Sequence, residues 1–160
     1  MGGPHIRDYR PEDFEKLWAI DQACFDPQVA YSRGELKFYI ADPAAFTLVA
    51  EGSTWEPMGF VVAQQQRRAT GHTITIDVLE SARRQRLGSV LMEHAESRLR
   101  QQGCAAVTLE TAVDNLAAIH FYHRLGYSVV RTLRRYYSNG LDALLMRKPL
   151  AATHSNTAKI

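Results

Sequence analysis

The chain has 160 residues, of which 46% are hydrophobic and 22% charged, a size and composition that fit one folded domain with a sizeable core. Its formal net charge of +2 argues against nucleic acid as the partner, and no apolar run approaches the ~20 residues of a membrane span. Nothing near the N-terminus resembles a signal peptide, so we expect a cytoplasmic chain with reduced thiols. The two cysteines, Cys24 and Cys104, lack the spacing of metal ligands, and the sequence predicts no metal site.

Hydrophobic periodicity divides the chain into alternating strands and helices. The sequence predicts a short strand before Pro11, helices over 11–24 and 33–42, strands over 45–52, 58–66 and 72–80, a helix over 87–102, a strand over 104–113, a helix over 114–127, and strands over 127–137 and 142–150. This order, β-α-α-β-β-β-α-β-α-β-β, predicts an α/β fold with a mixed central sheet and helices on both of its faces. We expect one domain over residues 1–150 and a disordered tail over 151–160.

The strand over 72–80 alternates regularly. Its apolar residues are predicted to share one face and its polar residues the other, the two sets being Ile74, Ile76 and Val78 against Thr73, Thr75 and Asp77. Helix ends are marked as well: Gly103 and Gly126 are expected to stop two helices, and Asp114 to cap the start of the second.

The loop over 79–89 joins that strand to the following helix and contains three arginines, Arg83, Arg84 and Arg86. A helix N-terminus exposes unpaired N–H groups and partial positive charge, which together form an anion site. Gly88 has no Cβ and so permits close approach of a ligand to the backbone. These features suit a pyrophosphate, but they equally suit a solvated helix end in which the glycine relieves crowding.

The segment Arg83-Arg84-Gln85-Arg86-Leu87-Gly88 resembles the acetyl-CoA pyrophosphate loop of the GNAT (Gcn5-related) N-acetyltransferases, whose pattern is Gln/Arg-x-x-Gly-x-Gly/Ala. Arg86 replaces the first glycine of that pattern. Because helical dihedral angles are open to any residue except proline, we expect Arg86 in the first helical turn and cofactor binding to survive. The resemblance implies that the preceding strand bulges, splays from its neighbour and pairs with the pantetheine arm.

The resemblance extends over residues 5–150. The helix over 114–127 carries the family's Asn-x-x-Ala-x-x-Phe-Tyr-x-x-x-Gly-Phe/Tyr pattern, in Asn115, Ala118, Phe121, Tyr122, Gly126 and Tyr127. The residues that the resemblance assigns to cofactor binding are Ile76, Asp77, Val78, Arg83, Arg84, Gln85, Arg86, Leu87, Gly88, Ser89, Asn115 and Tyr122. A closer likeness is to the branch that acetylates protein N-termini, ribosomal proteins included, and is carried by Leu109-Glu110, Tyr136-Tyr137 and Asp142-Ala143…Met146.

Acetyl transfer to an amine needs a group that removes a proton from the ammonium. Glu110 matches the family's general base, although a strand-end glutamate facing water is the alternative. Tyr122, twelve residues later, matches the general acid, but it also fits packing against the sheet. Asn115 suits either pantetheine binding or helix capping.

The resemblance also implies the partners. Acetyl-CoA is expected as co-substrate, and a protein or peptide N-terminus, with those of ribosomal proteins among the candidates, as acceptor. Tyr31, Tyr136 and Tyr137 are candidates for holding the acceptor, and strand alternation would turn only one of the last two toward the site. A small-molecule amine as acceptor and a non-catalytic module that binds CoA or nucleic acid remain the alternatives.

Overall fold

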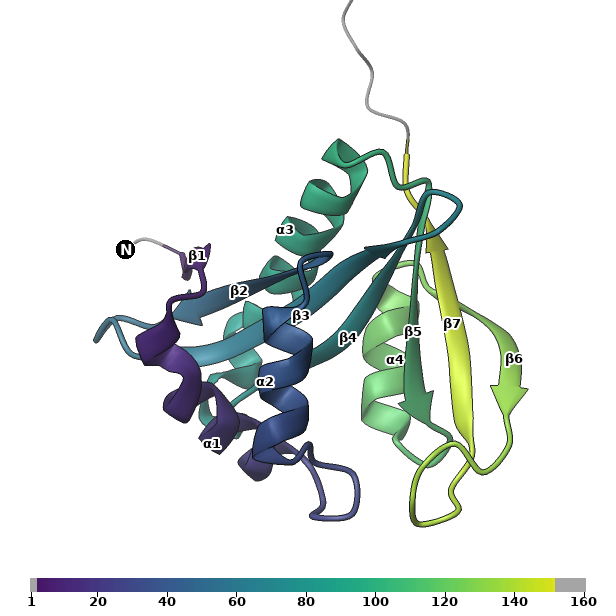
Figure 1. Ribbon diagram of the computed structural model, residues 1–160, viewed down its shortest axis with the longest axis horizontal. Helices are drawn as coiled ribbons and strands as arrows, with labels where there is room; N and C mark the ends of the chain where they lie inside the picture. The colour runs from purple at the N-terminus through teal and green to yellow at the C-terminus, as the bar shows by residue number, and fades with distance from the viewer. Residues whose placement is uncertain (1–2, 152–160) are drawn as a thin grey trace, which may run out of the picture.

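The computed structural model describes residues 3–151, and its strands and helices follow the predicted order (Figure 1). The strands are β1 (His5–Asp8), β2 (Ala45–Glu51), β3 (Pro57–Gln66), β4 (Thr70–Val78), β5 (Ala106–Ala112), β6 (Ser128–Leu133) and β7 (Ala143–Pro149). The α-helices are α1 (Phe14–Cys24), α2 (Arg33–Ala41), α3 (Leu87–Gln101) and α4 (Leu116–Arg124). Two 3-10 helices, η1 (Pro11–Asp13) and η2 (Glu80–Gln85), precede α1 and α3, so part of the predicted loop over 79–89 is helical.

The seven strands form one mixed sheet in the order β1-β2-β3-β4-β5-β7-β6. Only the β4–β5 pair is parallel, and the other neighbours are antiparallel. We call β1–β4 the N-terminal arm of the sheet and β5, β7 and β6 the C-terminal arm. The predicted mixed sheet is therefore confirmed, with the one parallel pair at its centre.

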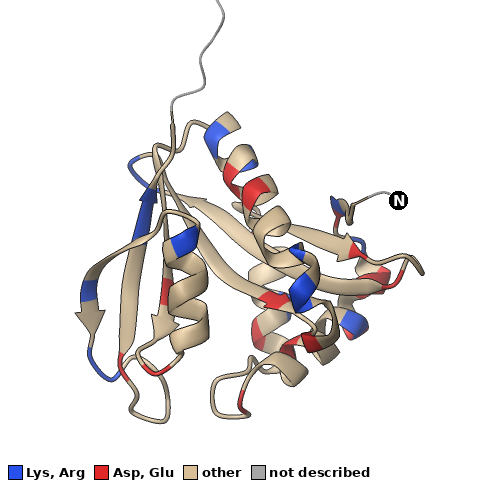
Figure 2. Ribbon diagram, turned by 180° about the vertical axis from the view of Figure 1, so that it is seen from behind, with Lys and Arg blue, Asp and Glu red and all other residues tan. Residues whose placement is uncertain are grey.

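Helices cover both faces of the sheet, as predicted. α1 and α2 lie on one face of the N-terminal arm (Figure 1), and α3 and α4 lie on the opposite face (Figure 2). Each face has its own core: Leu17, Leu36 and Phe60 lie in the cluster under α1 and α2, and Leu91 and Leu99 lie in the cluster under α3. Burial of these side chains is the main source of stability for both layers.

The helix boundaries follow from local chemistry. Ser32 caps α2 by accepting a hydrogen bond from the amide of Glu35, whose carboxylate accepts one in return from the Ser32 amide. Gly103 and Gly126 have φ angles of 92° and 100°, a region that glycine enters without steric penalty. Both predicted helix stops are therefore confirmed.

A β-bulge in β4 changes the predicted faces of that strand. Thr75 lies opposite Val62 and Thr73 lies opposite the next residue of β3, so Ile74 has no partner there. Ile74 consequently packs into the α1–α2 cluster, whereas Ile76 and Val78 pack toward α3. The predicted single apolar face was wrong because an extra residue reverses the alternation.

The last hairpin also differs from prediction. β6 ends at Leu133, so Tyr136 and Tyr137 lie in the β6–β7 loop and strand alternation does not govern them. Residues 152–160, for which the sequence predicts disorder, lie outside the described residues. No helix in the described range 3–151 is long and apolar enough to cross a membrane.

Candidate active site

The site begins where the two arms of the sheet part. β4 and β5 pair only over three residues, from Thr70 opposite Ala106 to His72 opposite Thr108. Beyond His72 the strands diverge, and the rest of β4 has no partner on its β5 side (Figure 1). The bulge and the splay expected for this strand are thus both present, and they leave backbone polar groups of β4 available to a ligand.

A histidine and a glutamate meet at this divergence. His72 Nε2 lies 2.6 Å from Glu110 Oε2, and the two side chains are 16% and 18% exposed. In this contact the ring nitrogen donates to an ionised carboxylate or accepts from a protonated one, as the tautomer decides. His72 Nδ1 is buried and has no hydrogen-bond partner among the described residues. Glu110 is therefore oriented by a second titratable group and does not simply face water.

The sequence did not reveal His72, because the contact depends on the register between two strands that are far apart in the chain. The one signal present was its position in β4, the strand next to that of Glu110. With the register known, the two residues point to the same side of the sheet from adjacent strands.

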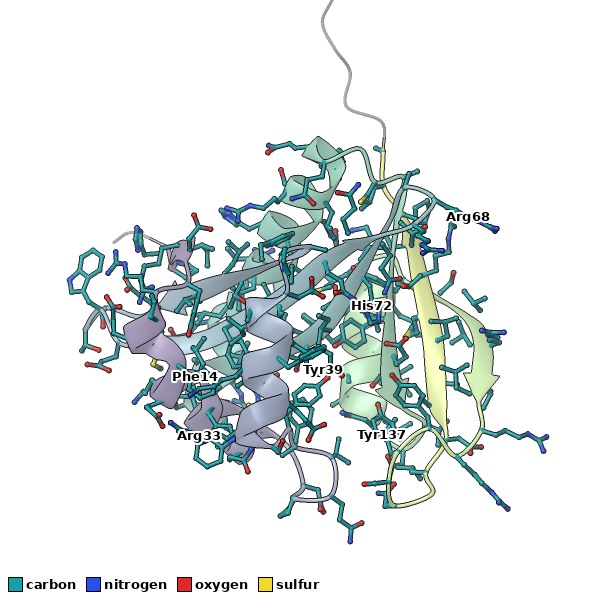
Figure 3. All side chains as sticks on the ribbon, in the orientation of Figure 1. Phe14, Arg33, Tyr39, Arg68, His72 and Tyr137 are labelled. Carbon is teal, nitrogen blue, oxygen red and sulfur yellow. The ribbon has the colours of Figure 1, made fainter. Side chains whose placement is uncertain are left out.

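Two tyrosines, Tyr136 and Tyr137, lie near Glu110, and two more, Tyr31 and Tyr39, lie near Tyr136. Tyr136 and Tyr137 are in edge-to-face contact at 5.0 Å, and Tyr31 packs on Tyr39 at 5.2 Å. Burial raises the pKa of Tyr137 to about 12 and also raises that of Tyr136, and the nearby Glu110 charge adds to both shifts. Both phenols of the β6–β7 loop therefore lie within reach of Glu110. Figure 3 shows Tyr39, His72 and Tyr137 in the region between α2 and β5.

Two loops touch at the edge of this region. The hydroxyl of Ser138, in the β6–β7 loop, donates to the carbonyl of Gln28, in the α1–α2 loop, at 2.8 Å. Tyr31, in the same α1–α2 loop, donates to the carbonyl of Ile74 at 3.3 Å. The first bond joins the two arms on the α1–α2 side of the sheet, and the second fixes the α1–α2 loop to β4.

Tyr122 lies on α4 and is only 9% exposed. Its ring contacts that of Tyr127 at 5.8 Å, so the predicted packing role is real. Its hydroxyl forms no hydrogen bond within residues 3–151, and burial raises its pKa, with Asp77 and Tyr137 adding to the shift. At neutral pH the hydroxyl is therefore a protonated donor near the end of β4.

The arginine-rich loop adopts an unexpected backbone. Arg86 has φ 61° and ψ 19°, the left-handed region, and it is the N-cap of α3, not a member of its first turn. The expectation of helical dihedral angles was therefore wrong: the chain must turn sharply from η2 into α3, and glycine makes that turn without the Cβ clash. The first intrahelical bond is donated by Val90 to Arg86, which leaves the amides of Leu87, Gly88 and Ser89 without helix carbonyls.

The side chains of the loop divide by exposure. Arg83, Arg84, Gln85 and Arg86 are exposed, whereas Leu87 is buried in the α3 cluster, so only its amide faces a ligand. Arg83 Nε donates to the carbonyl of Val78 at 3.1 Å. Three cations and three free amides thus surround one helix end, which is the composition of an anion site.

Gly88 serves packing between helices. A Cβ at this position would approach the Phe121 ring of α4 to 3.1 Å, closer than most side-chain contacts. The interpretation that Gly88 relieves crowding is therefore supported on this side of α3.

A pocket of about 510 Å³ lies near the start of the loop and is lined by Ala23, Cys24, Leu79, Glu80 and Ser81.

Asp77 was expected at the cofactor through its backbone, and its side chain points the other way. It is 1% exposed and accepts a hydrogen bond from Thr75 at 2.6 Å. Burial raises its pKa well above the usual value, and its contact with the equally buried Asp21 of α1 raises it further. The pKa of Asp21 is raised by burial as well. The two buried carboxyl groups therefore hold a proton to higher pH than exposed carboxyl groups do.

Asn115, not Asp114, is the N-cap of α4. Its side chain accepts a hydrogen bond from the amide of Ala118 at 3.2 Å. This corrects the predicted cap by one residue and shows that the capping interpretation of Asn115 holds.

Comparison with known proteins gives a consistent result. The sequence model of the Acetyltransferase (GNAT) family matches residues 9–127. An N-alpha-acetyltransferase of Sulfurisphaera tokodaii is 40% identical over 81 residues, half of this chain and 48% of its own. The N-alpha-acetyltransferase 30 of Schizosaccharomyces pombe is 29% identical over 116 residues, 71% of this chain and 77% of its own. The first of these matches spans about half the length of the curated relative.

A solved structure extends the similarity over nearly the whole chain. Ard1 from Thermoplasma volcanium superposes with a TM-score of 0.86 at 26% sequence identity, covering 94% of this chain and 99% of that one. The fold and the order of elements around the divergence of β4 and β5 are therefore shared with a protein of known structure.

Proposed function

Because the chain belongs to the GNAT family of acetyltransferases, we propose that it transfers an acetyl group from acetyl-CoA to the α-amine of a protein or peptide. The observation that carries this proposal is the contact of His72 with Glu110 where β4 and β5 part. The names of the matched relatives, both N-alpha-acetyltransferases, support the α-amine as acceptor.

The residues present fit acetyl-CoA. The free amides at the start of α3 and the side chains of Arg84 and Arg86 would hold its pyrophosphate, and the unpaired side of β4 would pair with its pantetheine arm. Acetyl-CoA, when bound, supplies the acetyl thioester. The fit rests mainly on the amides of Leu87, Gly88 and Ser89, since unpaired groups are stabilised by a ligand that satisfies them. On β4, the carbonyls of Ile74 and Val78 already accept bonds from Tyr31 and Arg83.

The acceptor must lose a proton before its nitrogen can attack, because an ammonium has no free electron pair. Glu110, oriented by the contact with His72 Nε2, takes that proton. Tyr122 donates a hydrogen bond from its hydroxyl toward the departing sulfur, and it remains protonated at neutral pH because burial raises its pKa. Glu110 thus acts on the attacking nitrogen, and Tyr122 acts on the leaving sulfur.

The acceptor is held by phenols. Tyr136 and Tyr137 lie near the Glu110 charge and Tyr31 lies near Tyr136, and their rings supply contact area at low cost in side-chain entropy. The Ser138–Gln28 bond holds the β6–β7 loop against the α1–α2 loop at one edge of this region. A free chain end meets this constraint more easily than a group in the middle of a folded segment.

The test is the substitution Glu110→Gln. We expect it to lower kcat on acetylatable peptides by about a hundredfold or more, because general-base catalysis contributes on that order. The Kd for acetyl-CoA, measured by calorimetry, should stay within about twofold, since the free amides of α3 are untouched. Glu93→Gln, an exposed glutamate on α3, is the matched control and should retain full turnover.

Unchanged turnover of Glu110→Gln across the pH range would refute the assigned base. A panel of peptides, among them ribosomal-protein N-termini, and free small amines tests the acceptor class. Acetylation of the small amines with no activity on any peptide would show that the acceptor is a small molecule.

A further inference from the structure

Within the described residues 3–151, one face of the C-terminal arm is not covered by a helix. α1 and α2 pack against β2, β3 and β4, whereas none of the described helices lies on the same face of β5, β7 and β6 (Figure 1). α4 lies behind this arm, on the opposite face (Figure 2). We call the uncovered surface the open face and define it by Glu110, Leu145, Arg131, Thr108 and Arg147.

The strand register places these residues in two rows. Glu110 lies opposite Leu145 of β7, which in turn lies opposite Arg131 of β6. Thr108 lies opposite Arg147 in the neighbouring row. Residues directly opposite each other project to the same face of a sheet. Glu110 and both arginines therefore share the open face.

The register also sets the distance between Glu110 and Arg131. Neighbouring strands lie about 4.8 Å apart, so the backbone of Arg131 is about 10 Å from that of Glu110. An extended peptide advances about 3.3 Å per residue. With its α-amine at Glu110, such a peptide has its third or fourth residue beside Arg131.

The charge on this arm is unbalanced. Arg131 and Arg147 are exposed, and within residues 3–151 neither of them forms an ion pair. Residues 106–151, which span the whole arm, contain three acidic residues, Glu110, Asp114 and Asp142, and six basic ones: Arg124, Arg131, Arg134, Arg135, Arg147 and Lys148. Figure 2 shows this excess of Lys and Arg over α4, β6 and β7. An acidic group beside Arg131 and Arg147 would therefore meet net positive charge, although Glu110 lies at the start of the same row.

We propose that the open face binds the part of the acceptor that follows its α-amine, and that Arg131 and Arg147 select acceptors with Asp or Glu at the third and fourth positions. This rests on the proposed function, whose acceptor class it narrows. Nucleic acid is the less suitable ligand, because the row of Arg131 begins at the reacting group Glu110 and its length matches a short peptide.

The test compares two peptides that differ only by Glu or Gln at positions three and four. We expect the wild-type kcat/KM to be about five- to tenfold higher for the Glu peptide, since each exposed ion pair contributes a few tenths to 1 kcal/mol. The double variant Arg131→Ala/Arg147→Ala should abolish the ratio, and Arg131→Glu/Arg147→Glu should reverse it. Added salt should reduce the wild-type ratio.

Controls separate this proposal from the proposed function. Arg124→Ala removes an exposed arginine from α4 on the other face and should leave the ratio unchanged. Unchanged acetyl-CoA affinity shows that each variant is folded. Equal rates on both peptides would overturn the selection while leaving the acetyltransferase activity intact, and no acetylation of any peptide would overturn both.

A nucleic-acid site would give a different pattern. Single-stranded RNA that binds wild type but not the Glu double variant, together with equal rates on the two peptides, would overturn the proposal in favour of RNA.

Discussion

The backbone of Arg86 lies in a region that side chains with a Cβ enter at a cost of about 1 kcal/mol. The residue nevertheless brings a third guanidinium to a helix end whose first amides have no helix partner. The chain therefore combines a less favourable backbone with additional positive charge at the same position. Two substitutions separate these effects, because alanine keeps the Cβ and glycine removes it.

We expect Arg86→Gly to be more stable than Arg86→Ala by about 1 kcal/mol in urea unfolding, since only glycine removes the left-handed clash. Both variants lose the same charge, so both should weaken acetyl-CoA binding by the same factor. Equal stability of the two variants would mean that the turn at residue 86 carries no strain.

At the scale of single elements, Asn115 at the start of α4 is a candidate for two roles. Asn115 caps the helix through Ala118. Its place in the family pattern also suggests contact with the pantetheine arm. Stability and cofactor affinity report on these roles separately.

Asn115→Ala should lower the free energy of unfolding by about 1 kcal/mol, or the Tm by about 3 °C, because the cap is lost. Asn115→Ser should restore the Tm, since serine caps nearly as well. A wild-type Tm for Asn115→Ala would contradict the capping role. A restored Tm with weaker acetyl-CoA binding in Asn115→Ser would show that the amide also contacts the cofactor.

Sequence periodicity identified every strand and α-helix but not how they fit together. The bulge at Ile74 and the end of β6 at Leu133 depend on partners across the sheet, which local patterns do not specify. His72 was missed for the same reason, because its contact with Glu110 exists only through the β4–β5 register. Glu110 could be named as a candidate base without the register, because it matches a residue of the family pattern.

At the scale of the whole molecule, a buried pair of carboxyl groups links stability to pH. Asp21 and Asp77 both have raised pKa values, so the folded state holds their proton at a pH where the unfolded chain has released it. Their contribution to stability is complete below the usual value of 3.8 and is lost as the pH rises above it.

Asp77→Asn should therefore gain stability relative to wild type as the pH is raised from about 4, by at most about 1.4 kcal/mol per pH unit. Thermal unfolding across the pH range measures the difference. Asparagine keeps the bond from Thr75 and can donate to Asp21, so the fold is preserved. Asp114→Asn, at an exposed carboxylate, is the control and should run parallel to wild type. Parallel curves for Asp77→Asn would show that the pair holds no additional proton.

The position of α3 has a consequence for how the two arms move. Its cluster contains Val61 from the N-terminal arm and Leu109 and Met146 from the C-terminal arm, and Glu96 of α3 bonds to Lys148 of β7. Opening the arms further would expose this shared core, so the separation of β4 and β5 is fixed by the same packing that folds the protein. The gap between β4 and β5 is therefore already ordered in the folded protein. A cofactor that binds there orders few further residues, so the entropy cost of its binding is small.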